Sequence, residues 1–282
     1  MTIDAAITEA SRSLKIAGIE QPAREARLLL AFVLDRPDSF IFAHPERELG
    51  TVEAERFGEA VRRRSLREPF HYIVGKREFY GLEFFVNPFV LIPRPETEIV
   101  VGEAIRTLEG LDRPRFIDVG TGSGCIAISI LTNVKTARGT ASDISVEAIR
   151  VARSNAANHD VLDRVDLLAT DIFDAIGETR SDLVVSNPPY IAQIEIRSLQ
   201  PEVREHEPKH ALTDGMDGLR VLERIIRDAP KRLRPGGRLL LEIGAGQAGL
   251  VKRMFDERIW EDIHSIEDLQ RIPRVISGRL SD

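Results

Sequence analysis

Cysteine and long apolar runs are scarce in this chain of 282 residues, and basic residues are outnumbered by acidic ones. Its single cysteine, Cys125, excludes an intramolecular disulfide and is typical of a reducing compartment. No uncharged apolar stretch is long enough to span a bilayer. The first residues also lack the basic segment and apolar core of a signal peptide. From these absences we expect a cytoplasmic protein with no membrane partner.

The charge balance is acidic, with a formal net charge of -6 and a pI near 5.7. Proteins that bind nucleic acid usually carry a basic face, so the bulk charge argues against DNA or RNA as the main partner. The composition is otherwise that of an ordinary globular protein, because 43% of the residues are hydrophobic and 30% are charged. At this length the chain can form one large domain and one small domain.

Helical periodicity dominates the first quarter of the chain. Helices are expected over 7–17, 23–34 and 52–67. The aromatic-rich segment 77–86 then predicts a β-hairpin around Gly81, and a proline-rich stretch follows it. We therefore expect a small helical domain over 1–75 and a hairpin linker over 76–95.

Strands and helices alternate from residue 96 to the C-terminus. Strands are expected over 116–119, 138–143, 165–169, 182–186 and 237–243. Helices are expected to begin at Glu96, Cys125 and Val146, and another is expected over 219–233. The tail, 274–280, is expected to add an edge strand. This alternation predicts an α/β domain over 96–282, built on a mostly parallel sheet with right-handed connections.

A glycine-rich turn follows the first expected strand of this domain. Glycines at this place let the backbone approach a ligand closely, at the end of the sheet where open α/β folds bind ligands. The spacing differs from the G-x-G-x-x-G of dinucleotide sites and from the phosphate-binding P-loop. The turn is a candidate binding loop, and a purely structural turn is the alternative. Its residues are Gly120, Thr121, Gly122, Ser123 and Gly124.

Acidic residues end the next two expected strands. Asp143 is placed to accept hydrogen bonds from both hydroxyls of a ribose, roughly twenty residues after the last glycine. The alternative is that Asp143 caps the helix expected to begin near Val146. At the end of the third strand, Asp171 is expected to accept from an adenine amino group, while Ile172 lies against the adenine ring.

The fourth strand leads into the sequence Asn187-Pro188-Pro189-Tyr190. Proline has no backbone N–H and restricts the residue before it, so the chain must leave the sheet in a stiff, extended loop. This loop presents a side-chain amide, carbonyl groups and an aromatic ring. Such a set suits a planar group that carries an NH2, since the oxygens accept its hydrogens and the ring stacks on its face. A cis-proline turn that only shapes the loop is the alternative.

Taken together, these four strand ends resemble the class I S-adenosylmethionine-dependent methyltransferases. In that superfamily an Asn/Asp-Pro-Pro-Tyr/Phe loop marks enzymes that methylate a nitrogen conjugated to a planar system. Within it the chain is similar to the HemK/PrmC family, the peptide chain release factor glutamine methyltransferases. The similarity extends from about Arg67 to the C-terminus, and the family also has a helical domain before the hairpin. It is carried by the segments 75–79, 91–98, 117–128, 185–191, 207–212 and 240–244.

The resemblance implies a Rossmann-like domain with a mostly parallel seven-stranded sheet, and S-adenosylmethionine as the cofactor with S-adenosylhomocysteine as the product. It implies transfer of the methyl group to the side-chain amide nitrogen of the glutamine in the Gly-Gly-Gln motif of bacterial class I release factors, a step in translation termination. Some family members carry Trp where this chain has Ile172, so that contact with adenine is expected to be weaker. The implied catalytic residues are Asn187, Pro188, Pro189 and Tyr190. The implied cofactor residues are Gly120, Thr121, Gly122, Ser123, Gly124, Asp143, Asp171, Ile172 and Asn187.

Two other functions fit parts of this pattern. A DNA or RNA amino-methyltransferase would use the same loop, but it needs a basic cleft or a recognition domain to take a base out of its stack, and the sequence shows neither. A non-catalytic binding module with a degenerate methyltransferase fold is disfavoured, because the glycines, Asp143 and the proline loop are all intact.

The remaining polar motifs have weaker interpretations. The segment 206–210 matches the zinc pattern H-E-x-x-H, but Pro208 would kink the helix that this pattern requires, so no metal is expected. Cys125 is interpreted as a small buried residue. Four residues have two open interpretations each, structural on one side and a role beside cofactor or substrate on the other. They are Arg94, Glu96, Thr97 and Glu242.

Overall fold

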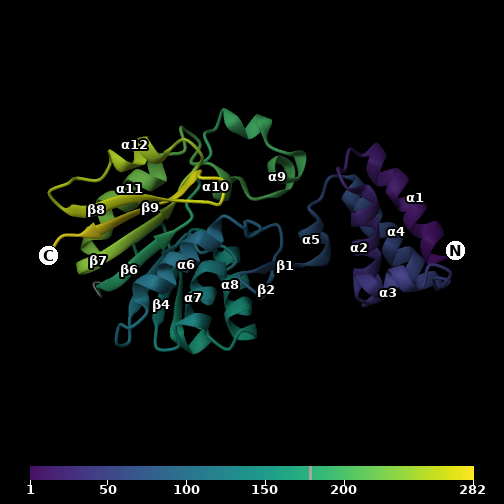
Figure 1. The fold of residues 1–282 in the computed structure, drawn as a ribbon, viewed down its shortest axis with the longest axis horizontal. Coiled ribbons are helices and arrows are strands. Elements are labelled where there is room, and N and C mark those ends of the chain that lie inside the picture. Colours follow the sequence, from purple (N-terminus) through teal and green to yellow (C-terminus); the bar gives the residue numbers. More distant parts are fainter. Residues whose placement is uncertain (178–179) are drawn as a thin grey trace. The chain divides into compact units, whose positions relative to one another are not determined.

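The computed structural model describes residues 1–177 and 180–282, and these form two compact units (Figure 1). We call residues 1–75 with 200–206 the helical unit. Residues 76–199 and 207–282 form the sheet unit. Within the described residues there is no helix that is both long and apolar enough to cross a membrane.

The helical unit consists of packed helices whose apolar faces meet in one core. Thr2 caps its first helix, since its hydroxyl accepts a hydrogen bond from the Ala5 amide at 3.3 Å. The shared core includes Leu14, Leu30 and Phe57. The elements are α1 (Ile3–Ile16), α2 (Pro22–Leu34), α3 (Asp38–Ala43), α4 (Thr51–Ser65), α5 (Phe70–Val74) and α9 (Pro201–His206).

The three helices expected here correspond to α1, α2 and α4, and two short helices were missed. The missed helices, α3 and α5, have 6 and 5 residues, which is too short for an apolar stripe to repeat. The sequence also did not predict that the segment 200–206, which contains α9, belongs to the helical unit, because it lies more than a hundred residues after the rest of that unit.

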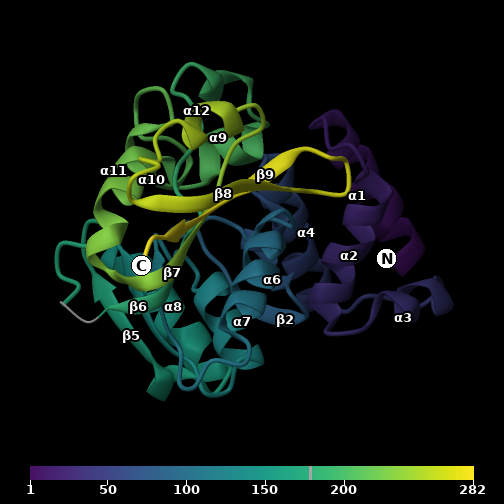
Figure 2. The same cartoon turned by 60° about the vertical axis from the view of Figure 1, so that its left-hand side comes forward.

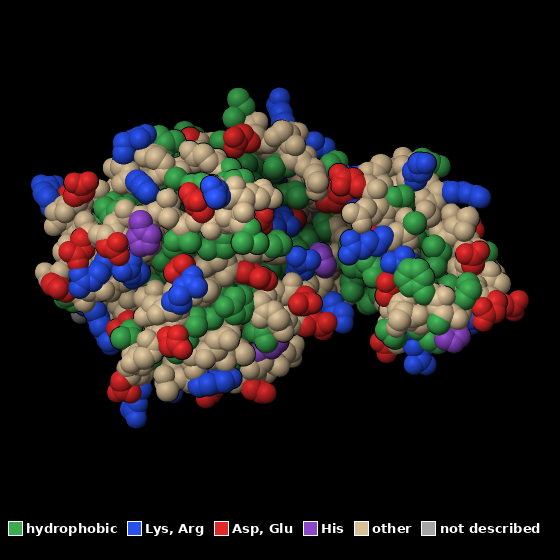
Figure 3. All heavy atoms as spheres, in the orientation of Figure 1, with side chains coloured by type: hydrophobic (Ala, Val, Ile, Leu, Met, Phe, Trp, Pro, Cys, Tyr) green, Lys and Arg blue, Asp and Glu red, His purple; other side chains and the backbone are tan. Residues whose placement is uncertain are grey.

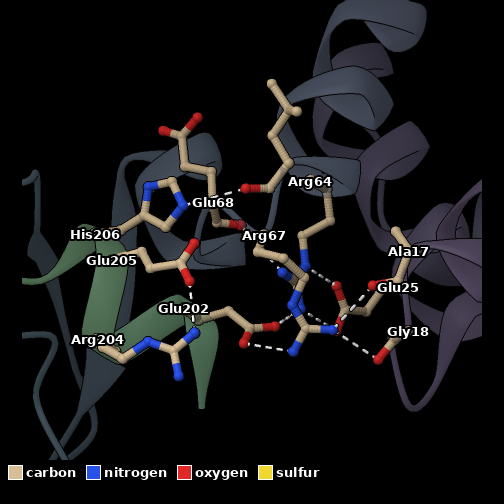
Figure 4. A network of polar contacts seen from close by, with 11 residues as sticks. Ala17, Gly18, Glu25, Arg64, Arg67, Glu68, Glu202, Arg204, Glu205 and His206 are labelled. Atoms are coloured by element: carbon tan, nitrogen blue, oxygen red, sulfur yellow. Dashed lines mark hydrogen bonds and ion pairs between the residues drawn. The ribbon is translucent and has the colours of Figure 1, made fainter. Parts of the chain in front are cut away.

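A network of charged side chains holds α9 within the helical unit (Figure 4). Arg64 of α4 is 6% exposed and donates to the carboxylates of Glu25 and Glu202. Arg67 donates to the other oxygen of Glu202 at 2.6 Å and to the Gly18 carbonyl at 2.7 Å. The buried guanidinium of Arg64 is thus matched by acceptors from α2 and α9, so its charge is compensated.

The sheet unit begins with the hairpin, which has the expected position. Strands β1 (Lys76–Phe79) and β2 (Leu82–Phe85) pair antiparallel, and Gly81 takes a left-handed conformation in the turn with φ 71°. Phe79 and Phe84 are buried in the core of the sheet unit. The hairpin is therefore part of that unit's packing.

Seven strands of the described residues form the main sheet, in the order β5-β4-β3-β6-β7-β9-β8. The first five in the chain are parallel, and β9 runs antiparallel to both of its neighbours. The strand order reverses between the neighbouring strands β3 and β6. Open α/β sheets bind ligands at the carboxyl ends of the strands beside such a reversal. The strands are β3 (Arg115–Val119), β4 (Arg138–Asp143), β5 (Val165–Ala169), β6 (Ser181–Ser186), β7 (Leu233–Glu242), β8 (Trp260–Glu267) and β9 (Pro273–Leu280).

Helices cover both faces of this sheet, as Figures 1 and 2 show. Side chains alternate along each strand, so Leu183 and Val185 of β6 join one core while Val184 joins the other. The first core includes residues of α6, α7 and α8, and the second includes residues of α11 and α12. The helices of the sheet unit are α6 (Thr97–Leu108), α7 (Cys125–Asn133), α8 (Val146–Asn158), α10 (Lys209–Leu212), α11 (Arg220–Asp228) and α12 (Ala248–Lys252).

The expected α/β fold is confirmed, and two local predictions are wrong. The helix expected over 219–233 ends at Asp228, because Pro230 leads into a 3-10 turn and β7 already begins at Leu233. The strand expected at the edge over 274–280 is β9, which lies between β7 and β8. The missed edge strand β8 has no compact apolar run in its sequence.

We predict that Arg64→Met destabilises the helical unit by about 3 kcal/mol, because it leaves the half-buried carboxylates of Glu25 and Glu202 without the buried guanidinium that donates to them. The measurement is amide hydrogen exchange in α2 and α4, which should accelerate roughly a hundredfold. Arg62→Met is the matched control, since the Arg62–Glu59 pair is exposed, and it should leave exchange unchanged. Equal exchange in the two variants would contradict the role given to the Arg64 network.

Candidate active site

A cavity of about 420 Å³ lies at the carboxyl ends of β3, β4 and β6. This is the size of a site for a small organic molecule. It is lined by every residue predicted to bind cofactor except Gly124, and by Asn187, Pro188 and Pro189. Tyr190 is absent from the lining. The structure therefore brings together nearly all of the predicted residues in a single cavity.

The glycine turn follows β3 and is fixed by backbone hydrogen bonds to the neighbouring strand. The amides of Gly120 and Thr121 both donate to the Ser142 carbonyl, at 2.8 and 2.9 Å. Gly124 has φ 83°, and a Cβ on it would lie 2.8 Å from Cδ1 of Ile128. A Cβ on Gly124 would also lie 3.3 Å from Cβ of Ala152, so this glycine lets the start of α7 pack closely against α8, and it does not line the cavity.

Asp118, which the sequence analysis did not identify, anchors this turn through a side-chain hydrogen bond. It is completely buried, and its Oδ2 accepts from the Thr121 hydroxyl at 2.6 Å. Burial raises the pKa of Asp118 to about 7. The only available signal was its place as the acidic residue just before the glycines, and many such residues are merely structural.

Asp143 connects the end of β4 to the glycine turn. Its Oδ2 accepts from the Gly122 amide and its Oδ1 from the Ser145 amide, both at 2.9 Å. Burial raises the pKa of Asp143, and these two amides oppose that shift. The capping alternative does not hold, because α8 is capped by Ser145, whose hydroxyl accepts from the Ala148 amide at 3.1 Å.

The end of β5, where Asp171 was expected to border the adenine, has a feature that the sequence did not predict. Both oxygens of Asp171 accept from Nη1 of Arg224 in α11, at 3.2 and 2.9 Å, and both residues line the cavity. Ile172 has φ 49°, a left-handed conformation that is rare for a β-branched residue. Its carbonyl accepts from the Ser142 hydroxyl at 3.1 Å, which helps to hold this conformation.

The proline loop leaves β6 with trans peptide bonds before Pro188 and Pro189, so the cis-proline alternative is wrong. Asn187 donates from Nδ2 to the Thr97 hydroxyl oxygen at 3.0 Å. Its Oδ1 has no hydrogen-bond partner among the residues that the structure describes. The loop therefore presents the Asn187 amide oxygen at the edge of the cavity, while the hydrogen bond to Thr97 holds the other end of the amide.

Tyr190 is fixed on the far side of this loop. Its hydroxyl donates to Oε1 of Glu242 at 3.1 Å, and its carbonyl accepts from Nε2 of Gln247 at 2.8 Å. Burial and the Glu242 carboxylate raise the pKa of the Tyr190 hydroxyl. A Cβ on Gly218 would lie only 2.1 Å from the Tyr190 carbonyl oxygen, so only glycine fits beside this part of the loop.

The segment 206–210 has a structural use that replaces the zinc interpretation. Glu207 is 4% exposed and accepts from Nη2 of Arg94 at 2.6 Å and from the Ile92 amide at 3.3 Å. Arg94 also lines the cavity. Glu207 thus holds the proline-rich stretch 91–98 against the cavity wall.

Asn155 is a further residue that sequence reasoning missed. It lies fully buried in the middle of α8, where nothing in the sequence sets it apart. Its side chain bonds both the amide and the carbonyl of Phe85, at 2.8 and 3.0 Å, and donates to the Ser123 carbonyl at 2.8 Å. Asn155 thereby joins the hairpin to the glycine turn.

Comparison with known proteins gives two matching family models. The PrmC N-terminal domain matches residues 5–75, and the methyltransferase small domain matches residues 104–205. A solved methyltransferase from Pyrococcus furiosus shares the fold, with a TM-score of 0.53 and 16% identity over 72% of this chain and 91% of that one.

Two curated relatives match nearly the full length, and both are named release factor glutamine methyltransferase. The protein of Koribacter versatilis is 39% identical over 280 residues, which is 99% of each chain. That of Cereibacter sphaeroides is 42% identical, over 98% of this chain and 97% of its own. Because full-length relatives and both family models agree with the site, the chain belongs to the release factor glutamine methyltransferase family.

Proposed function

We propose that this protein transfers a methyl group from S-adenosylmethionine to the side-chain amide nitrogen of the glutamine in the Gly-Gly-Gln motif of class I peptide chain release factors. One observation carries the proposal. The same cavity contains the glycine turn, the buried carboxylate of Asp143 and the outward-facing amide oxygen of Asn187. A cofactor site and an acceptor for a planar NH2 group are thus adjacent.

The residues present fit the cofactor. Gly120 and Gly122 have left-handed backbones, and a Cβ on either would extend into open space, so their lack of a side chain leaves room for a ligand. We propose that Asp143 accepts from the ribose hydroxyls and that Asp171 and Ile172 border the adenine, with Arg224 holding the Asp171 carboxylate in place by two hydrogen bonds. When bound, S-adenosylmethionine supplies an electrophilic methyl group on a sulfonium.

The proline loop would prepare the glutamine amide for attack. An amide nitrogen is a poor nucleophile because its lone pair is delocalised into the carbonyl. We propose that Asn187 Oδ1 and the Pro188 carbonyl accept its two N–H bonds and so aim the nitrogen at the methyl group. Orientation of this kind can contribute several kcal/mol, within the ceiling of roughly 7–11 kcal/mol for that effect. The same two oxygens stabilise positive charge as it develops on the nitrogen.

No side-chain base is required for this reaction, because the methylated nitrogen becomes acidic and loses its proton afterwards. Pro189, which lines the cavity, is proposed to border the flat face of the substrate amide, whereas Tyr190 does not line the cavity and is proposed to brace the loop. The anchored Tyr190 hydroxyl would keep its ring in place during turnover.

We further propose that the helical unit, residues 1–75 in the main, binds the protein substrate, with 76–95 as the link to the methyltransferase domain over 96–282. The family model for residues 5–75 supports a specialised role for this part. Since release factors act in translation, the reaction would take place in the cytoplasm.

Methylation of DNA or RNA bases is the second candidate, because the same loop type serves those enzymes. Charge disfavours it here. On the face drawn in Figure 3, Lys and Arg side chains are interspersed with Asp and Glu, and the whole chain carries a net charge of -6.

Labelled S-adenosylmethionine tests the proposed function directly. We expect label in a purified class I release factor, no label in the variant whose Gly-Gly-Gln glutamine is replaced by alanine, and none in duplex DNA or structured RNA. Label in nucleic acid but not in the release factor would refute the proposed function.

Asn187→Ala should lower turnover by roughly a hundredfold or more, because the nitrogen loses both an acceptor and its alignment. Cofactor affinity, measured by calorimetry, should stay close to that of the unmodified protein. Asn158→Ala, an exposed position on α8, serves as the control. Turnover close to normal in Asn187→Ala would rule out this role of the loop.

Asp143→Asn should weaken cofactor binding by roughly 10- to 100-fold, the worth of a hydrogen bond to a charged group. Calorimetric titration with S-adenosylhomocysteine measures this without turnover. The control is Asp166→Asn, on the exposed side of β5, which should bind as the unmodified protein does. Unchanged affinity in Asp143→Asn would remove Asp143 from the cofactor site.

A further inference from the structure

Glu242 is a buried carboxyl to which the proposed reaction gives no part. It ends β7, is 1% exposed and does not line the cavity, so it cannot touch a substrate. Its Oε1 accepts from the Tyr190 hydroxyl. Its Oε2 is buried and makes no well-formed hydrogen bond within the described part of the chain. A buried carboxylate oxygen is costly without a donor, so a nearby donor is expected.

No hydrogen bond to Glu242 Oε2 is formed among the described residues, and Thr97 is the residue to which we assign the missing donor. It is 2% exposed, and its oxygen already accepts from Asn187 Nδ2. A threonine hydroxyl has one proton and two lone pairs, so Thr97 still has its proton to donate. Burial raises the pKa of Glu242 to about 7, and hydrogen bonding from Thr97 and Tyr190 opposes that shift, which places the Thr97 hydroxyl beside the carboxyl.

We propose that Glu242 is a positioning residue that sets the direction of a hydrogen-bond relay: Asn187 donates to Thr97, and Thr97 donates to Glu242. The relay holds the Asn187 amide oxygen toward the cavity. This inference rests on the proposed function, since that oxygen is the one that would accept from the substrate amide.

The direction of the relay matters because the two ends of an asparagine amide have nearly the same shape. Hydrogen-bonding neighbours alone decide which end faces the cavity. While Thr97 donates to a carboxylate, its oxygen can only accept, and Asn187 must present its NH2 group there. If the relay were reversed, the Asn187 NH2 would face the NH2 of the substrate, and two donors would meet.

Protonation of Glu242 would remove the constraint on the relay, because a protonated carboxyl can donate to Thr97 and so frees the Thr97 proton to bond the Asn187 amide oxygen. Turnover should therefore be present above the pKa of Glu242, about 7, and be lost as pH falls through it. The charged groups around this carboxyl act in opposite directions, since Glu96 raises its pKa and Arg274 of β9 lowers it. The other titratable groups that face it are Tyr190 and Cys125.

The first experiment measures kcat, KM and their pH profiles for Glu242→Gln. Glutamine fills the same space but can either donate or accept, so it leaves the relay without a direction. We expect kcat to fall by roughly 10- to 100-fold above the pKa of Glu242, with unchanged cofactor affinity. The acidic limb of the profile should disappear. A limb that persists in this variant belongs to another group such as Asp118, whose pKa is also about 7, and would overturn the proposal.

Thr97 variants test the same relay from its middle. Thr97→Val removes the hydroxyl with little change in shape, and it should lower kcat as Glu242→Gln does. The double variant should be no worse than either single variant, because both break one relay. Thr97→Ser restores the hydroxyl and should keep kcat within roughly threefold of normal. Additive losses, or a Thr97→Val enzyme of normal kcat, would contradict the relay.

A third measurement does not depend on turnover. The side-chain amide signal of Asn187 in a nitrogen-15 NMR spectrum, assigned by its absence in Asn187→Ala, should titrate with a midpoint near 7, and this titration should vanish in Glu242→Gln. An Asn187 amide signal insensitive to pH would overturn the relay even if the methylation assay failed. Normal methylation with an unaffected Glu242→Gln variant would overturn the relay alone and leave the proposed function standing.

Glu267→Gln is the matched control for all three measurements. Glu267 is an exposed carboxyl at the end of β8, in the same sheet as Glu242. The substitution should change neither kcat, nor the pH profile, nor the Asn187 amide signal. A thermal unfolding curve for each variant separates a loss of positioning from a loss of fold.

Discussion

Carboxyl groups buried at the ends of parallel strands organise the sheet unit. Asp118, Asp143 and Glu242 end β3, β4 and β7 or lie within a residue of those ends, and each is 9% exposed or less. A buried carboxylate is stable only where donors compensate it. The donors come from the loops that build the cavity: the Thr121 hydroxyl, the Gly122 amide and the Tyr190 hydroxyl. Burial of these acids therefore fixes the loops before any ligand arrives, and preorganised donors and acceptors favour catalysis.

The helical unit also depends on a buried charge that its neighbours compensate, but there the buried charge is positive and the neighbours are negative. There the buried group is the guanidinium of Arg64, and the carboxylates of Glu25 and Glu202 compensate it. Glu202 lies on α9, twelve residues beyond Tyr190 in the chain, yet it belongs to the helical unit. The chain that leaves Tyr190 thus enters the helical unit before it returns at Glu207. A single covalent segment connects the proposed catalytic loop to the proposed substrate-binding part.

The sequence allowed the local features of this fold to be predicted, because short-range patterns determine them. Strands β4 and β5 were predicted at their observed bounds, and Asp143 at the end of β4 and Asp171 just after β5 both line the cavity. Features that depend on distant partners were missed. Asn155 looks like any polar helix residue until the hairpin packs against it. Thr97 and Glu242 are 145 positions apart, so no local pattern links them. Tyr190, expected to stack on the substrate amide, is absent from the cavity lining, and its hydroxyl donates to Glu242.

The proline loop depends on both local and distant residues. Strand β6 places the loop, Thr97 bonds the Asn187 amide, and Glu242 accepts from the Tyr190 hydroxyl. We propose that the NH2 group held by this loop belongs to a glutamine side chain. Mass spectrometric mapping of a class I release factor after incubation with the protein and S-adenosylmethionine tests this most directly. We expect one added methyl group, on the side-chain nitrogen of the Gly-Gly-Gln glutamine. A methyl group on any other residue, with that glutamine unmodified, would contradict it.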